Sequence, residues 1–171
     1  GPYGVSAYYM EAKMAEAQAM VNAKAVILDV GKRFGKLSGR AYGLFESYCM
    51  DDAEEAIVLI GSSAGTARVC VDKLRSAGHK VGMIKLRVYR PFPGDELAEA
   101  LKNVKAVAVM DKCESYSTHG GPLGAELRSA LYDAGQHPLL INFIYGLGGR
   151  DFAVTDCETV FHALDDALEK G

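Results

Sequence analysis

Four short apolar runs, each followed by a polar or glycine- and proline-rich loop, constrain the fold of this chain more than any other feature. Between the runs, apolar residues recur with the 3.6-residue period of a helix. Such runs alternating with helices are typical of βαβ units around a parallel sheet. The runs are residues 56–60, 81–84, 106–110 and 139–144. The loops after them should gather along one edge of the sheet, where ligands and partners of such sheets usually bind.

Other elements are expected around these runs. Residues 6–33 hold strong helix formers and no glycine before Gly31, which predicts one long helix that packs on its own sheet or lies across another part. The alternating aromatic segment 42–49 predicts an edge strand. We therefore divide the chain into a helix and connection, 1–40, and an α/β domain, 41–171. Further helices are expected at residues 64–76, 95–102, 122–132 and 156–169, the last with a Thr155/Glu158 capping box.

Composition excludes several classes of protein. The 171 residues carry a net charge of −3, which gives no reason to expect nucleic acid or an anionic membrane as partner. No apolar stretch approaches the ~20 residues needed to span a bilayer, and no signal peptide opens the chain, so we expect a cytoplasmic protein. The start at Gly1, without methionine, favours a processed or excised piece of a longer polypeptide.

The four cysteines are Cys49, Cys70, Cys113 and Cys157. None forms the close pair through which one loop presents two thiolates to zinc or an iron–sulfur cluster, so no metal site is expected. Cys70 lies on the apolar face of an expected helix and should be a buried structural thiol. Cys113 lies in an edge loop and is the candidate for reactivity.

Residues 61–66, GSSAGT, follow a strand and open a helix, as a dinucleotide phosphate loop does. Serine and threonine stand where that motif needs glycines, so capping of the helix by Ser62, Ser63 or Thr66 is favoured, with a bound anion as the alternative. Residues 94–96, GDE, resemble the start of a thiamine diphosphate motif but lack its third glycine. Turn chemistry explains these residues better.

Two edge loops hold further polar candidates. The loop 111–121 contains Asp111, Lys112, Glu114 and His119, residue types that serve as acids and bases, but no catalytic order or metal spacing is present. We expect His119 to be a solvated loop residue. The segment 148–151, GGRD, reads as a local turn or as an interface anchor through Arg150. No catalytic, cofactor-binding or metal-binding residue is assigned.

Five motifs occur in order along the chain: YYMEAK (8–13), ESY with DAE (46–48, 52–54), GSSAGT (61–66), KLR with RPFP (85–87, 90–93) and GLGGRD (146–151). Through these motifs the chain resembles, over nearly its whole length, the C-terminal half, or domain II, of the alpha subunit of pyruvate:ferredoxin oxidoreductase. More distantly, residues 120–127, GGPLGAEL, are similar to the C-terminal domain of transketolase and of the oxo-acid dehydrogenase E1 beta chain.

The resemblance implies a three-layer α/β/α fold like that of the transketolase C-terminal domain. Its five-stranded mixed sheet has the order 1-3-2-4-5, with strand 1 antiparallel. The change in strand order then lies between the loops 61–66 and 111–121, the expected crevice. The candidates for binding an anion there are Ser62, Ser63, Thr66 and His119. In the complete enzyme the family implies thiamine diphosphate, iron–sulfur clusters and coenzyme A, but this segment shows no motif for any of them.

Our leading hypothesis is therefore a non-catalytic assembly domain of a pyruvate or other 2-oxoacid:ferredoxin oxidoreductase. Its partners would be the N-terminal half of the alpha subunit and the other subunits, with ferredoxin contacted indirectly. The alternatives are the C-terminal domain of another thiamine-dependent enzyme, of transketolase or E1 beta type, and a free-standing module that binds a small ligand or nucleotide. The expected interface residues are Arg87, Arg90, Pro91, Phe92, Gly148, Gly149, Arg150 and Asp151.

Overall fold

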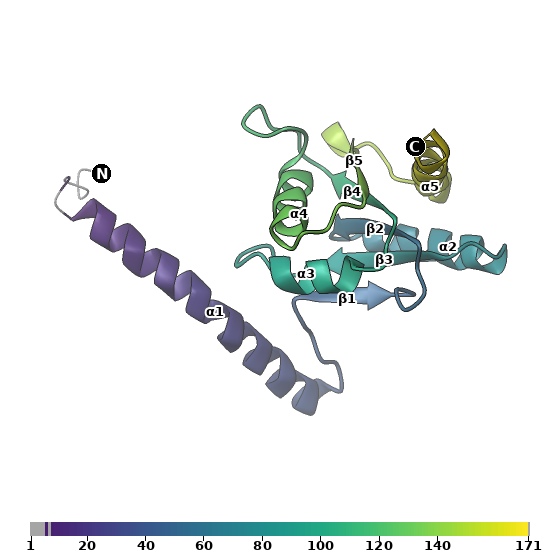
Figure 1. Ribbon diagram of the computed structural model, residues 1–171. Coiled ribbons are helices and arrows are strands. Elements are labelled where there is room, and N and C mark those ends of the chain that lie inside the picture. The colour runs from purple at the N-terminus through teal and green to yellow at the C-terminus, as the bar shows by residue number, and fades with distance from the viewer. Residues whose placement is uncertain (1–5, 7, 171) are drawn as a thin grey trace. The chain divides into compact units, whose positions relative to one another are not determined.

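The computed structural model describes residues 6 and 8–170, which fall into two compact units. One unit contains the chain up to Leu44 together with Val88–Phe92, and the other contains Phe45–Arg87 and the chain from Pro93 onward. Figure 1 labels the elements. They are α1 (Tyr9–Ser38), β1 (Phe45–Tyr48), β2 (Glu55–Ile60), α2 (Ser63–Ser76), β3 (Val81–Leu86), α3 (Gly94–Leu101), β4 (Ala106–Asp111), α4 (Pro122–Asp133), β5 (Leu139–Ile144), the 3₁₀ turn η1 (Leu147–Gly149) and α5 (Val154–Lys170).

The second unit is built on one five-stranded sheet. Its strand order is β1-β3-β2-β4-β5, with β1 antiparallel to β3 and the other neighbours parallel. This confirms the expected sheet, including the antiparallel edge strand before the repeats. Strands β2, β3 and β4 are almost completely buried, because helices cover both faces of a parallel sheet. That burial explains why their sequences read as continuous apolar runs.

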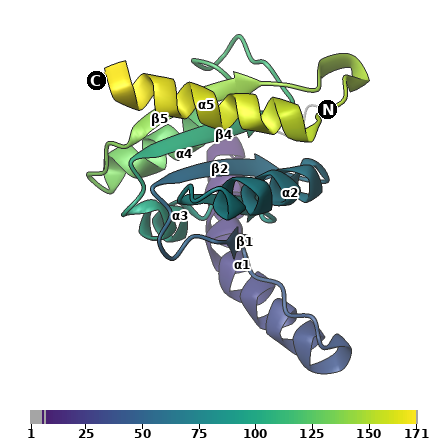
Figure 2. The same cartoon turned by 90° about the vertical axis from the view of Figure 1, so that its right-hand side faces the viewer.

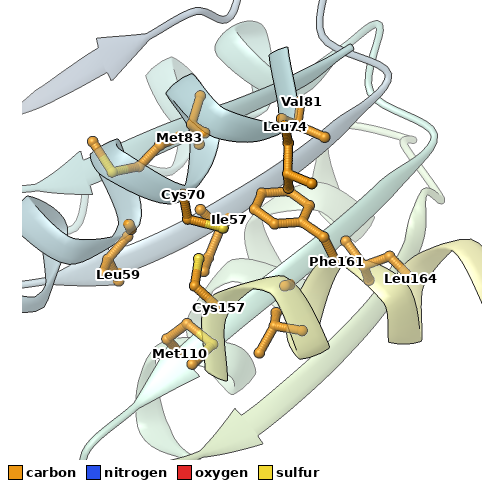
Figure 3. Packing of buried hydrophobic residues seen from close by; sticks show 14 of the residues in the cluster. Ile57, Leu59, Cys70, Leu74, Val81, Met83, Met110, Cys157, Phe161 and Leu164 are labelled. Carbon is orange, nitrogen blue, oxygen red and sulfur yellow. The ribbon is translucent and has the colours of Figure 1, made fainter. Parts of the chain in front are cut away.

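Two helical layers enclose the sheet. Helices α2 and α5 pack together on one face, and α3 and α4 pack on the other. Figure 2 shows α2 and α5 on the near side of the sheet. In Figure 3, Ile57, Met83 and Met110 of the strands lie among residues of α2 and α5 such as Phe161. Alternate strand residues face the opposite layer, as the period of two in a strand requires.

The helix α1 runs past the expected end at Arg33 to Ser38. The helix continues through Gly31 and Gly35, and the chain that returns after the helix occupies the space that a side chain at either position would need. A Cβ atom on Gly31 would lie 2.0 Å from the carbonyl oxygen of Tyr42. The helix instead ends at Gly39, whose φ of 74° is left-handed. At the other end it begins at Tyr9 rather than Ser6, and residue 7 lies outside the described residues.

None of the residues of α1 is buried. No helix in the described part of the chain is both long and apolar enough to cross a membrane. The large apolar side chains that α1 exposes are Tyr9, Met10, Met14, Met20, Val21, Val26, Val30, Phe34 and Leu37.

The expected capping box of the last helix was wrong by two positions. Helix α5 begins at Val154, and the Asp156 carboxylate accepts a hydrogen bond of 2.8 Å from the backbone N–H of Ala153. Glu158, expected in that role, instead pairs with Lys73 of α2 at 2.5 Å. The Glu158 carboxylate therefore joins α5 to α2 instead of capping its own helix.

Candidate functional site

The edge of the sheet at the ends of β2, β4 and β5 carries one buried carboxylate, Asp111, which is 5% exposed. Its two oxygens accept hydrogen bonds from the backbone N–H groups of Leu123 and Gly124, each at 3.0 Å. The amide of Asn142 on β5 donates to the same carboxylate at 2.9 Å. Asp111 therefore acts as an internal anion at the N-terminus of α4, where free N–H groups and the helix dipole favour negative charge.

Three glycines make this arrangement sterically feasible. A Cβ atom on Gly121 would lie 2.3 Å from the carboxyl carbon of Asp111, and one on Gly124 would lie 2.6 Å from the amide carbon of Asn142. Gly120 has a φ of 90° and would meet the Asn142 oxygen at 2.5 Å. That oxygen accepts the N–H of Gly121 at 2.6 Å. Glycine at these three positions therefore leaves room for the side chains of Asp111 on β4 and Asn142 on β5.

The residues proposed for an anion site differ in their burial and in their hydrogen bonds. Ser62 occupies the cap position of α2 but its side chain makes no capping hydrogen bond, so that expectation was wrong for Ser62. Ser63 is buried and hydrogen-bonds the phenol of Tyr145. His119 is exposed, and its carbonyl accepts from Arg128 at 3.2 Å. Among the described residues, no hydrogen bond or ion pair joins His119 to Ser62, Ser63 or Thr66.

A cavity of about 220 Å³ opens beyond the end of β5. Tyr145 packs edge-on against Phe152, with ring centroids 5.0 Å apart, and the Lys112 ammonium lies 5.3 Å from the centre of the Tyr145 ring. Burial raises the pKa of the Tyr145 phenol, and the hydrogen bond from Ser63 partly offsets that rise. Residues that line the cavity include Met110, Phe143, Tyr145, Arg150, Asp151, Phe152 and Asp156.

The glycine turn before Arg150 is the local structure that the sequence indicates. Gly146, Gly148 and Gly149 have φ values of 65°, 64° and 82°, a region that side chains disfavour. A Cβ atom on Gly146 would also lie 3.1 Å from Cε of Lys112. The turn places Arg150 and Asp151 at the cavity, while their role at an interface stays a prediction.

The arginines of the other expected interface segment fall in different units. Arg87, at the end of β3, forms an ion pair with Glu46 of β1, which also pairs with Arg68 of α2. Arg90 donates to the carbonyl oxygen of Tyr89 at 3.0 Å, and its guanidinium carbon lies 4.4 Å from the centre of that ring. Both arginines are thus ordered by neighbours in their own unit, and contact with another subunit stays a prediction.

A second, polar cavity of about 290 Å³ lies at the opposite end of the strands, where no sequence motif indicated a site. Burial, and then the hydrogen bond with Asp165 of α5, raise the pKa of Glu55 to about 8. Next to it, Lys105 and then Lys80 lower the pKa of Glu54 to about 2. Neighbouring glutamates thus prefer opposite protonation states, because one is buried against a carboxylate and the other is partly exposed between two ammonium groups.

Sequence reasoning missed Asn142. A signal was present, because Asn142 is the one polar residue in the apolar run LLINFI of β5. Its carboxamide nitrogen donates to the Val109 carbonyl oxygen at 3.0 Å as well as to Asp111. Within the part of the chain that the structure describes, no group of three or more His, Cys, Asp or Glu side chains could hold a metal ion.

Comparison with known proteins identifies the family. A profile of the pyruvate:ferredoxin oxidoreductase core domain II matches residues 53–157, which include all of the parallel strands. The chain belongs to this family. Two solved structures share the fold of this domain II chain at low identity. A 2-oxoglutarate:ferredoxin oxidoreductase from Magnetococcus marinus has a TM-score of 0.52 at 18% identity, over 79% of this chain and 21% of that one. A split-gene transketolase has a TM-score of 0.54 at 15% identity, over 70% and 41%.

Relatives at higher identity match this domain II chain from end to end. The pyruvate synthase subunit PorA of Thermotoga maritima is 39% identical over 168 residues, which are 98% of this chain and 42% of that subunit. The ketoisovalerate oxidoreductase subunit VorA of Pyrococcus abyssi is 40% identical over 172 residues, 100% of this chain and 43% of that subunit. The chain therefore spans less than half the length of these relatives.

Proposed function

We propose that this chain is an architectural part of a 2-oxoacid:ferredoxin oxidoreductase acting on pyruvate or a related 2-oxoacid. The match to core domain II, and relatives named as pyruvate synthase and ketoisovalerate oxidoreductase subunits, support this activity over that of transketolase. The complete enzyme would use thiamine diphosphate, iron–sulfur clusters and coenzyme A. In the proposal, those groups are held by other parts of the enzyme, and this segment fixes the geometry around them.

One observation carries the proposal, the exposed apolar surface of α1. Met10, Met14 and Val21 are spaced by four and seven residues, so they lie on one side of the helix. They are 66%, 63% and 68% exposed. Burying such a side chain fully stabilises a contact by about 1.5–3 kcal/mol. A helix that buries none of its residues lacks the packing that normally stabilises helices, so we propose that the rest of the alpha subunit covers this stripe.

The contacts of the Asp111 carboxylate with Leu123, Gly124 and Asn142, which we call the Asp111 clamp, support a structural role for the crevice. Three donors of the same domain already occupy the carboxylate, which leaves it engaged in positioning α4 rather than in accepting a proton from a substrate. The loop 112–121 begins directly after Asp111 and returns to the clamp at Gly121. The clamp therefore fixes both ends of the most polar loop on this edge.

The activity is tested by assaying 2-oxoacid oxidation with coenzyme A and an electron acceptor. The assay compares this segment alone, the assembled enzyme, and an enzyme that lacks the segment. We expect turnover only from the enzyme that contains the segment, because the cofactors carry the chemistry and the protein orients them. Turnover by the segment alone, or full turnover by a folded enzyme without it, would refute the architectural role.

The role of α1 is tested by the double variant Met14→Ser, Val21→Ser. We expect binding to the remaining subunit parts to weaken by at least about tenfold, since the loss of two buried side chains exceeds the 1.4 kcal/mol that corresponds to a factor of ten. Glu16→Ser is the matched control, because Glu16 lies on another side of the helix and forms only an exposed pair with Lys13. Equal binding by the double variant and the control would rule out this contact.

A further inference from the structure

Cys70 and Cys157 meet inside the layer formed by α2 and α5. Both are 0% exposed and belong to the apolar cluster between these helices and one face of the sheet. Figure 3 shows the two sulfurs close together, one from each helix. On α2 the buried positions around Cys70 are Ala67 and Leu74, and on α5 the stripe continues from Cys157 to Phe161, so both thiols lie in the helix contact.

The two thiols interact directly. The Cys157 S–H donates to the Cys70 sulfur, which lowers the pKa of Cys70, and the same bond together with burial raises the pKa of Cys157. The Lys73–Glu158 ion pair at 2.5 Å also joins the helices beside these cysteines. The charge of Lys73 lowers the pKa of Cys70, whereas that of Glu158 raises the pKa of both thiols. The hydrogen bond therefore favours the thiolate form of Cys70 and disfavours that of Cys157.

We propose that Cys70 and Cys157 form a redox-active dithiol, which a peroxide oxidises to a disulfide that links α2 to α5. The Cys70 thiolate attacks one oxygen of hydrogen peroxide, the O–O bond breaks, and the departing hydroxide takes a proton to leave as water. The Cys157 sulfur then attacks the sulfenic sulfur of Cys70, the S–O bond breaks, and a second water leaves with the proton of the Cys157 thiol. Two thiols and one peroxide thus give one disulfide and two waters.

Neither sulfur is exposed, so the peroxide reaches the pair when α5 separates locally from α2, an opening of the kind that folded proteins undergo below the global unfolding energy. The other two cysteines differ from this pair. Cys113 is exposed and its sulfur contacts the Glu114 carbonyl oxygen at 3.5 Å, and Cys49 is partly buried. Among the described residues, neither has a thiol partner. Cys113 of the unmodified chain therefore serves to calibrate the peroxide dose in the test.

The test uses the chain with Cys49→Ser and Cys113→Ser, so that only the pair remains. The reduced protein is incubated with hydrogen peroxide under native conditions, then denatured and treated with N-ethylmaleimide, and its mass and peptides are measured. We expect both alkylation sites to be lost together, with one peptide cross-linked between Cys70 and Cys157, and both to return after dithiothreitol. Adding Cys157→Ala should stop the reaction at a sulfenic acid on Cys70 that dimedone traps.

The competing interpretation is that the two cysteines only fill space as small apolar residues. Full alkylation of both after a peroxide dose that oxidises Cys113 in the unmodified chain would overturn the proposal. So would independent overoxidation of one thiol, or a disulfide between two molecules instead of within one. The main measurement keeps both cysteines, so it does not depend on the folding of variants at these buried positions.

Discussion

Replacing Asp111 with alanine tests the clamp that joins β4, β5 and α4. The wild-type carboxylate is 5% exposed and accepts three hydrogen bonds, from the N–H groups of Leu123 and Gly124 at 3.0 Å and from Asn142 at 2.9 Å. Asp111→Ala leaves all three donors without an acceptor. The variant also removes the negative charge that faces the positive end of the α4 dipole.

The expected loss follows from these contacts. A buried donor left unsatisfied costs about 1–3 kcal/mol, and water that enters the vacated space will satisfy some of the three. We therefore expect the free energy of unfolding to fall by about 3–5 kcal/mol, out of the 5–15 kcal/mol typical of a domain. Asp111→Asn keeps the shape and one acceptor but turns an N–H₂ group toward a donor, so we expect about 1–3 kcal/mol for that variant.

Urea unfolding followed by circular dichroism measures both variants, with the loss taken from the midpoint at an unchanged slope. Asp133→Ala is the matched control, because Asp133 is an exposed aspartate at the other end of α4. There the removal of negative charge near the helix C-terminus should be neutral or slightly stabilising. A loss below about 1 kcal/mol for Asp111→Ala, or a loss equal to that of the control, would refute the clamp as a stabilising unit.

Other predictions concern pH, packing and assembly. Because the folded pKa of Glu55 is about 8 instead of 4.5, the folded state keeps a proton that the unfolded state has released, so the contribution of Glu55 to stability is full below pH 4.5 and is lost as pH rises toward 8. Glu55→Gln should remove this pH dependence, which amounts to at most about 1.4 kcal/mol of unfolding free energy per pH unit. Urea midpoints measured across that pH range test this, and the same change of stability with pH in the variant and the wild type would contradict it. Gly82→Ala, whose Cβ would lie 2.5 Å from the Met50 sulfur, should lower stability by about 1–3 kcal/mol, whereas Gly65→Ala on α2, with open space around it, should not. Arg90→Ala should weaken assembly with the companion subunits in a pull-down while the melting temperature of the chain stays the same; an equal loss of melting temperature would make the residue structural.

Local sequence determined the elements of the α/β unit. The runs that became β2, β3 and β4 are apolar on both faces, because a central parallel strand buries both, and their period and bounding glycines distinguish them from the helices between. The left-handed turn at Gly148 and Gly149 could likewise be predicted from the sequence, since only glycine adopts that conformation without cost. The strand order came from the family resemblance, because periodicity carries no information about which strands are neighbours.

Tertiary structure decided the features that depend on residues distant in sequence. Residue 31 of α1 has to be a glycine because the Tyr42 carbonyl occupies the space beside it, and Glu158 pairs with Lys73 instead of capping α5. Asp111 and Asn142 meet only because β4 and β5 are adjacent in the sheet. Each contact depends on the register between elements, which no repeat along the chain encodes. Local periodicity therefore fixed which segments are helices and strands, whereas packing fixed where they end and which side chains meet.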